Sequence, residues 1–151
     1  MLIVSAALGP VRSNIPLRPQ WRLPADLAAT GHTMIDFGDD ALTRVRPHPM
    51  IDGSYRIDRL AAEATDPTCG VVLLDVVLGH GAHPDPAAQL TPAIAAAHVP
   101  VVVSLIGTAH DPQGLRRQAS ALCDAGPAVF ASNADAARHA VQLVNPELGH
   151  A

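Results

Sequence analysis

The most regular pattern along the chain is an alternation between continuous apolar runs and segments with helical spacing. Residues 71–77 and 99–106 are almost uninterrupted runs of Val, Leu and Ile, which is typical of strands buried on both faces. Pro100 stands among the first residues of the second run, where a strand tolerates proline. Two shorter runs, 33–37 and 128–132, predict two further strands.

Helices are predicted between and after these runs. Ile51, Tyr55 and Leu60 recur near helical spacing. Asp111 is expected to cap a helix whose first residue is Pro112. The predicted helices cover residues 51–64, 85–97, 112–125 and 133–144. Because strands alternate with helices, we predict parallel strands joined by right-handed crossovers.

The expected fold class is α/β, a flavodoxin-like three-layer sandwich with a mostly parallel sheet over residues 32–151. Residues 1–31 contain four prolines with arginines between them. Proline removes backbone donors and breaks helices. We therefore predict an irregular Pro/Arg-rich arm with room for at most one short element at each end.

Composition narrows the functional classes. The apolar fraction of 48% with only 3% aromatic residues predicts a core of Ala, Val, Leu and Ile. A net charge of −4 argues against nucleic acid or an anionic membrane as a partner. No apolar run approaches the roughly 18 residues of a membrane span. The start lacks the basic residues of a secretory signal, and two cysteines make no disulfide framework. We expect a cytoplasmic protein.

Lysine is absent, since all ten basic residues other than histidine are arginines. The chain therefore has no P-loop lysine, no Schiff-base lysine and no lysine general base. The same absence disfavours a phosphorelay receiver domain, which has a similar fold but uses a lysine.

Three turns follow the carboxyl ends of predicted strands, at residues 38–40, 78–83 and 107–111. Such ends meet at one edge of a parallel sheet, where ligands bind. Free amides and the dipole at a helix N-terminus favour anions there. The residues predicted to bind an anion or phosphate are Gly79, His80, Gly81, Gly107 and Thr108. The predicted supporting residues are Arg46, His48, Asp52, Asp39, His110 and Asp111. No catalytic residue is assigned.

Other interpretations of these residues stay open. Gly79 and Gly81 would also suit a tight turn with no ligand, and Asp39 would also suit a helix cap. Histidines near Asp85 would suit a metal-dependent hydrolase built on His80, His83 and Asp85. Because that spacing spans a turn rather than one helical face, we predict no metal site.

Five strings resemble the FdrA family of acyl-CoA-synthetase-like proteins. They are GPVRSNIPL at 9–17, MIDFGDD at 34–40, RPHPMID at 46–52, VLLDVVLGHG at 72–81 and GTAHDPQ at 107–113. FdrA proteins look like fused relatives of succinyl-CoA synthetase, and this segment is similar to the β-type CoA-ligase domain. The resemblance implies that the 79–81 turn begins a helix facing a phosphohistidine of the other half, so that neither His80 nor His48 is the phosphorylated residue.

The resemblance also implies what the chain needs. No cofactor is expected on this chain alone, whereas CoA and ATP are implied for the complete enzyme. The expected partners are an α-type, CoA-binding domain or subunit and a small anionic substrate, and a homo-oligomer stays open. Activity is expected only together with those other domains. The alternatives are a component of an oxamate carbamoyltransferase-type enzyme and a non-catalytic anion-binding or interaction module.

Overall fold

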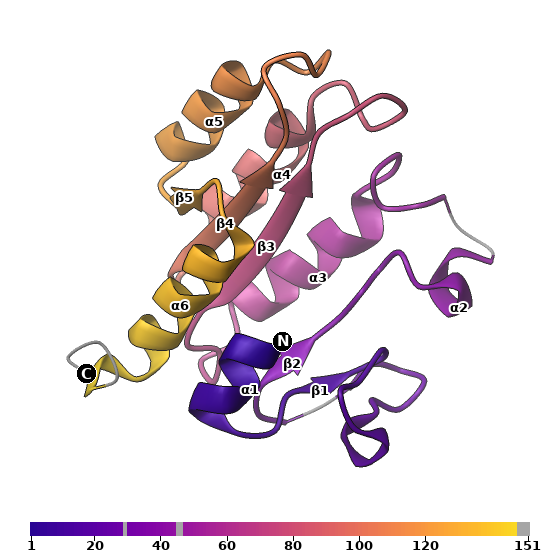
Figure 1. Ribbon diagram of the computed structural model, residues 1–151, viewed down its shortest axis with the longest axis vertical. Coiled ribbons are helices and arrows are strands. Elements are labelled where there is room, and N and C mark those ends of the chain that lie inside the picture. Colours follow the sequence, from indigo (N-terminus) through magenta and orange to yellow (C-terminus); the bar gives the residue numbers. More distant parts are fainter. Residues whose placement is uncertain (29, 45–46, 148–151) are drawn as a thin grey trace. The chain divides into compact units, whose positions relative to one another are not determined.

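The computed structural model describes residues 1–28, 30–44 and 47–147 (Figure 1). The chain divides into two compact units, Met1–His48 and Pro49–Ala151, and each is described by itself. The predicted boundary between an arm (1–31) and a domain (32–151) rests on composition, whereas the two compact units are defined by the contacts inside each unit. That boundary therefore stays a prediction.

The larger unit contains a parallel sheet of three strands. Its strands are β3 (Val72–Val77), β4 (Val101–Ile106) and β5 (Ala128–Phe130), in that order across the sheet. Its helices are α3 (Ser54–Ala64), α4 (Pro86–Ala95), α5 (Leu115–Asp124) and α6 (Asn133–Val144). Both strand pairs are parallel. The α/β class is therefore confirmed, and parallel sheets flanked by helices agree with a flavodoxin-like sandwich.

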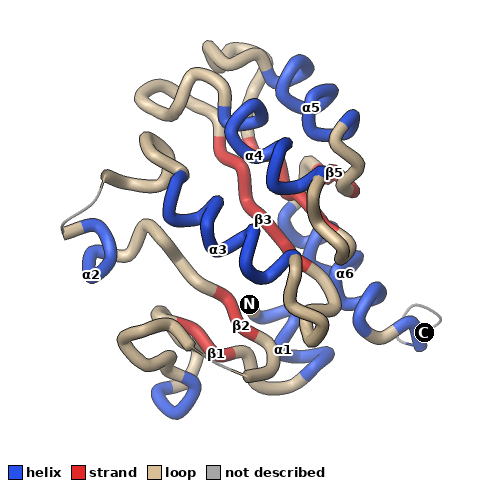
Figure 2. The backbone as a smooth tube through the Cα atoms, turned by 180° about the vertical axis from the view of Figure 1, so that it is seen from behind, coloured by secondary structure: helices blue, strands red, loops and turns tan. Residues whose placement is uncertain are grey.

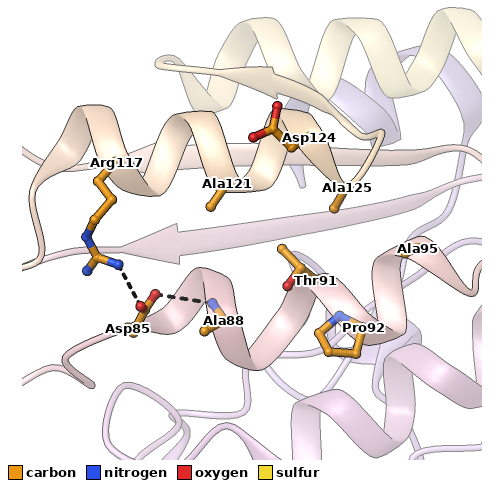
Figure 3. A pocket seen from close by; sticks show the side chains of 9 residues that line it. All are labelled: Asp85, Ala88, Thr91, Pro92, Ala95, Arg117, Ala121, Asp124 and Ala125. Atoms are coloured by element: carbon orange, nitrogen blue, oxygen red, sulfur yellow. Dashed lines mark hydrogen bonds and ion pairs between the residues drawn. The ribbon is translucent and has the colours of Figure 1, made fainter.

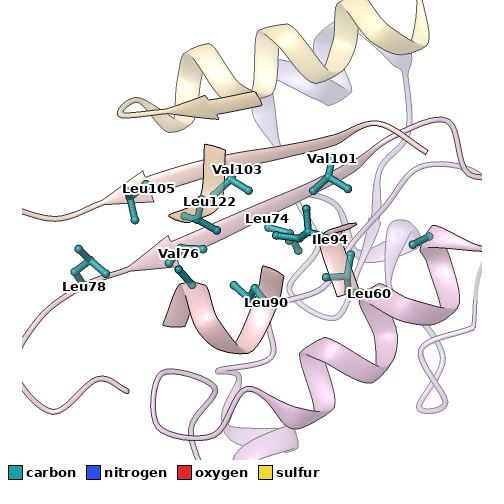
Figure 4. Packing of buried hydrophobic residues seen from close by; sticks show 12 residues of the cluster. Leu60, Leu74, Val76, Leu78, Leu90, Ile94, Val101, Val103, Leu105 and Leu122 are labelled. Carbon is teal, nitrogen blue, oxygen red and sulfur yellow. The ribbon is translucent and has the colours of Figure 1, made fainter. Parts of the chain in front are cut away.

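The helices cover the two faces of this sheet unequally. Helices α3, α4 and α5 lie on one face and α6 lies on the other (Figures 1 and 2). Alternate strand residues face the three helices, and they form the main core with Leu60, Leu90 and Leu122 (Figure 4). A smaller cluster under α6 contains Val102 and Ala136. As predicted, the core is aliphatic.

Two helices begin later than predicted, and the local reason is the same for both. The helix expected from Pro112 begins at Leu115 after Gly114, which has a left-handed φ of +71°. The predicted cap at Asp111 is wrong, because its carboxylate accepts the Thr108 N–H, three residues earlier, at 2.6 Å. Likewise, the Asp52 carboxylate accepts the Ser54 N–H, and α3 begins only there. Both aspartates form turns that delay the helix.

The smaller unit is more ordered than the predicted arm. It contains α1 (Leu2–Leu8), β1 (Arg12–Ser13), the short 3-10 helix η1 (Pro19–Trp21), β2 (Thr33–Met34) and α2 (Asp40–Thr43). Strands β1 and β2 pair in parallel. Asn14 then connects the arm to the next turn, since its amide group both donates to and accepts from the backbone of Asp36. Three of these elements, α1, β1 and η1, lie within residues 1–31, so the prediction of at most one short element at each end of the arm is wrong.

The length and hydropathy of the helices show whether any of them could cross a membrane. Within the described ranges, no helix combines the length and apolar character that crossing a bilayer requires.

Candidate functional site

The bends after β3 and β4 leave the same edge of the sheet. Val77 and Ile106 are register partners in adjacent parallel strands, and Leu78 N–H donates to the Ile106 carbonyl at 2.8 Å. The loops 79–85 and 107–114 start directly after these residues. The expectation of a shared edge is confirmed for these two bends. The third predicted turn, 38–40, belongs to the other compact unit.

The first bend is an open glycine turn. Gly79 has a backbone φ of +149° and Gly81 a φ of +82°, and residues other than glycine rarely adopt such values. A Cβ at either position would meet no atom within 4 Å. Ala82 N–H closes the turn on the Gly79 carbonyl, whereas the N–H groups of His80 and Gly81 have no hydrogen-bond acceptor among the described residues. Two adjacent amides are thus left for solvent or a ligand.

A buried glutamine holds both ends of this turn. Gln113 is only 2% exposed. Its Oε1 accepts Gly79 N–H at 3.2 Å, and its Nε2 donates to the carbonyls of Gly79 at 2.8 Å and His83 at 3.3 Å. Because one planar amide group makes all three bonds, it fixes the shape of the turn.

The N-terminus of α4 already has acceptors inside the protein. Pro86 lacks an N–H, Ala87 N–H donates to Oε1 of the fully buried Gln118 at 2.8 Å, and Ala88 N–H donates to Asp85 at 3.2 Å. The expectation that the 79–81 turn begins the helix is therefore wrong, because α4 begins only at Pro86. An anion at this edge would meet the loop amides of His80 and Gly81 rather than the first amides of α4.

Asp85 supplies the negative charge at this helix end. The amide of Gln118 donates to its Oδ1 at 2.9 Å. The Arg117 guanidinium contacts its Oδ2 at 2.6 Å, as Figure 3 shows. These two contacts, the first most strongly, lower the pKa of Asp85 to about 2. At neutral pH the carboxylate is ionised and is paired with Arg117.

The second bend uses several of its polar groups internally, whereas Ala109 N–H has no acceptor among the described residues. Thr108 N–H donates to Asp111, and His110 N–H donates to the Thr108 hydroxyl at 3.2 Å. A Cβ on Gly107 would approach both Asp111 Oδ2 and Leu78 Cβ to 3.0 Å, so a side chain there would press against both neighbours. Thr108 and His110 are both exposed.

His83 joins the first bend to the segment before α3. Its N–H donates to the Met50 carbonyl at 2.6 Å, and its Nδ1 accepts Asp85 N–H at 3.1 Å. In this arrangement the neutral ring carries its proton on Nε2. The pKa of nearby Asp52 is lowered, mainly by hydrogen bonds from Ser54 and to a smaller extent by His83.

The comparisons with known proteins place this chain in a family. A family model described as CoA-ligase matches residues 2–143. The chain belongs to the CoA-ligase family. The uncharacterized protein YahF of Escherichia coli (strain K12) is 39% identical over 142 residues, which are 88% of this chain and 28% of YahF. The chain thus spans just over a quarter of the length of YahF.

The other predicted site residues of the CoA-ligase domain are placed as follows. Arg46 lies outside the described residues. Asp39 and His48 belong to the smaller unit, where Asp39 caps α2 by accepting Ala41 N–H at 2.9 Å. A Cβ at Gly38 would lie 2.6 Å from His48 Nε2. The helix-cap interpretation of Asp39 therefore matches its contacts.

The prediction missed three residues that build the site, namely Gln113, Arg117 and Gln118. Arg117 pairs with Asp85 at 2.6 Å while its side chain stays exposed. For Gln118 a signal exists, because it shares the apolar face of α5 with Leu115 and Leu122. A polar residue on such a face must find a buried hydrogen-bond partner.

Metal chemistry receives no support. Among the described residues, no group of three or more His, Cys, Asp or Glu side chains is arranged to hold a metal ion. The alternative of a hydrolase built on His80, His83 and Asp85 is therefore not carried further.

Proposed function

We propose that this CoA-ligase domain is the β-type domain or subunit of an FdrA-type acyl-CoA synthetase, and that its 79–82 turn binds the anionic group in transfer. The observation that carries the proposal is the pair of free N–H groups on His80 and Gly81, in a turn with open space around both glycines. Adjacent amides of this kind bind phosphate or carboxylate oxygens.

Of the two carboxylates near the turn, one is paired with a cation and the other keeps its charge. The carboxylate of Asp85 is paired with Arg117, and the carboxylate of Asp111 accepts the Thr108 N–H. The side chains of His80 and His110 are exposed on the two neighbouring loops. Preorganised donors that face developing negative charge lower the barrier of group transfer. We therefore assign the turn the role of stabilising the transferred group.

The proposed enzyme needs more than this chain. The chain matches 28% of YahF, and it belongs to a ligase family. In the proposal, other domains or subunits bind CoA and ATP and carry the phosphorylated histidine, and the enzyme acts in the cytoplasm. Both cysteines are free, which agrees with a reducing compartment. Neither the contacts nor the comparisons favour the carbamoyl-transfer alternative.

The test is a titration of the full chain with inorganic phosphate, in which binding is monitored by the NMR chemical shifts of the backbone amides. We expect the largest shifts at His80 and Gly81. The variant Gly81→Val should weaken binding about tenfold or more, because it strains the turn and fills the open space.

Gly126→Val is the matched control. Gly126 also has a positive φ, +102°, with nothing near its Cβ, but it follows α5 at the other end of the helix. This control should bind phosphate like the original chain. Largest shifts elsewhere, or equal losses in both variants, would refute the anion site.

A further inference from the structure

The ring of His83 connects the 79–85 loop to the start of α4. Asp85 N–H donates to Nδ1 of His83 at 3.1 Å, so the side chain bridges to the residue that caps the helix. The backbone of His83 is held as well, because its N–H donates to the Met50 carbonyl at 2.6 Å and its carbonyl accepts Nε2 of Gln113 at 3.3 Å. Of these three bonds, the one made by the ring depends on a protonation state.

The ring bond requires a neutral imidazole. Nδ1 accepts the Asp85 N–H through its lone pair, whereas a charged imidazolium has a proton on each nitrogen and no acceptor. Protonation would therefore bring Nδ1–H against Asp85 N–H, two donors in contact. A partly buried N–H that loses its acceptor destabilises the arrangement that leaves it so. Because histidine exchanges its proton between about pH 5 and 8, this bond can change within the physiological range.

The charged groups around His83 come from three segments. In the segment before α3, the carboxylate of Asp52 interacts electrostatically with His83. On the loop itself, Asp85 is paired with Arg117 of α5, as Figure 3 shows. The Arg117 guanidinium also donates to the Pro84 carbonyl at 3.5 Å. Because the carboxylate of Asp85 already has a cationic partner, Asp52 is the carboxylate that attracts a charged ring.

We infer that His83 is a positioning residue for the free amides of the 79–82 turn, and that its ring holds them in place only while it is neutral. This inference rests on the proposed function, because it concerns the same turn. With a neutral ring the loop is fixed at its start by Gln113 and at its end by the bond to Asp85. On protonation the ring turns from Asp85 toward Asp52 and releases the end next to α4. Acid therefore weakens the binding of an anion by the turn.

The first measurement follows the loop without any anion. NMR chemical shifts of the backbone amides and of the imidazole nitrogens are recorded for the full chain between about pH 8 and 5. We expect the Nε2-protonated ring at the upper pH, and a shift of the Asp85 amide that follows ring protonation. His83→Asn should abolish that shift, because an asparagine oxygen accepts the N–H two residues later without titrating. An unchanged shift in this variant overturns the inference.

His98→Asn is the matched control. His98 is an exposed histidine ahead of β4, and the same substitution there removes a titrating ring away from the loop. The Asp85 amide should keep its pH transition in this control. Loss of the transition in both variants would overturn the assignment of the transition to His83.

Asp52→Asn tests the movement of the ring. The carboxylate favours the charged imidazole, so its removal should move the transition of the Asp85 amide to lower pH. Asparagine keeps an oxygen for the Ser54 N–H, which preserves the turn before α3. A transition that stays in place or moves to higher pH would overturn the attraction of the ring toward Asp52.

Sulfate binding links the ring to the turn, since sulfate keeps the same charge over this pH range. At about pH 7.5, where the ring is neutral, the original chain and His83→Asn should bind sulfate equally. At about pH 5.5 the original chain should bind about threefold more weakly or less than the variant, because its loop alone has lost a hydrogen bond. Equal affinities at the lower pH, or tighter binding by the original chain, overturn the positioning role. Failure of sulfate to bind at either pH would refute the anion site itself, whereas the transition of the Asp85 amide does not depend on that site.

Discussion

The bends after β3 and β4 contain similar residues but behave differently. Each combines glycine, histidine and an aspartate that is followed by proline. In the first, Asp85 caps α4, and two loop amides stay free. In the second, Asp111 turns back to Thr108, and the helix starts only after Gly114. The first bend therefore has two adjacent free amides, and Gln113 of the second bend fixes the shape of the first.

The largest expected effect comes from Gln118, which connects α5 to the first bend. Gln118→Leu should destabilise the fold by about 2–3 kcal/mol, because it leaves Ala87 N–H buried without an acceptor and removes a donor to Asp85. Urea unfolding measures this change. Gln142→Leu, at an exposed position of α6, should change the free energy of unfolding by less than about 0.5 kcal/mol. Equal losses in both variants would contradict the assigned role of Gln118.

A second experiment asks whether the first bend depends on the second. Gln113→Ala removes three hydrogen bonds to Gly79 and His83. We expect phosphate binding to weaken about tenfold in a chain that still folds, because the free amides lose their fixed orientation. Asp111→Ala alters only the second bend and should not weaken phosphate binding. If both variants bind equally weakly, the division of roles between the bends is wrong.

The third and smallest effect concerns pH. Asp85 has a native pKa of about 2 against an ordinary value of 3.8. Its ionised form is therefore stabilised in the fold, and that contribution is complete above about pH 4 and is lost as the pH falls toward 2. Because the side chain is 36% exposed, solvent reduces the contribution to about 1 kcal/mol.

Unfolding free energies measured between pH 5 and pH 2 check this effect. Asp85→Asn keeps an oxygen for the helix cap but loses the charge, so its stability should fall less steeply over that range. An unchanged slope in the variant would assign the acid sensitivity of the fold to other carboxylates.

Much of the larger unit could be predicted from local patterns. The apolar runs around Val72–Val77 and Val101–Ile106 became parallel strands. Parallel topology then placed Gly79 and Gly107 at one edge. Helix starts were predicted less well. The sequence does not show whether the carboxylate of an aspartate accepts the N–H of a later residue, as at Asp85, or of an earlier residue, as at Asp111.

The alternation of apolar runs and helical segments determined by itself the α/β class, the aliphatic core and the common edge of two bends, because these depend on residue type and spacing along the chain. Only the tertiary structure decided which amides stay free. The deciding contacts join residues far apart in sequence, from Gln113 to Gly79 and from Gln118 to Ala87. A buried amide side chain satisfies whatever backbone group the packing brings to it, and that group cannot be read from local sequence.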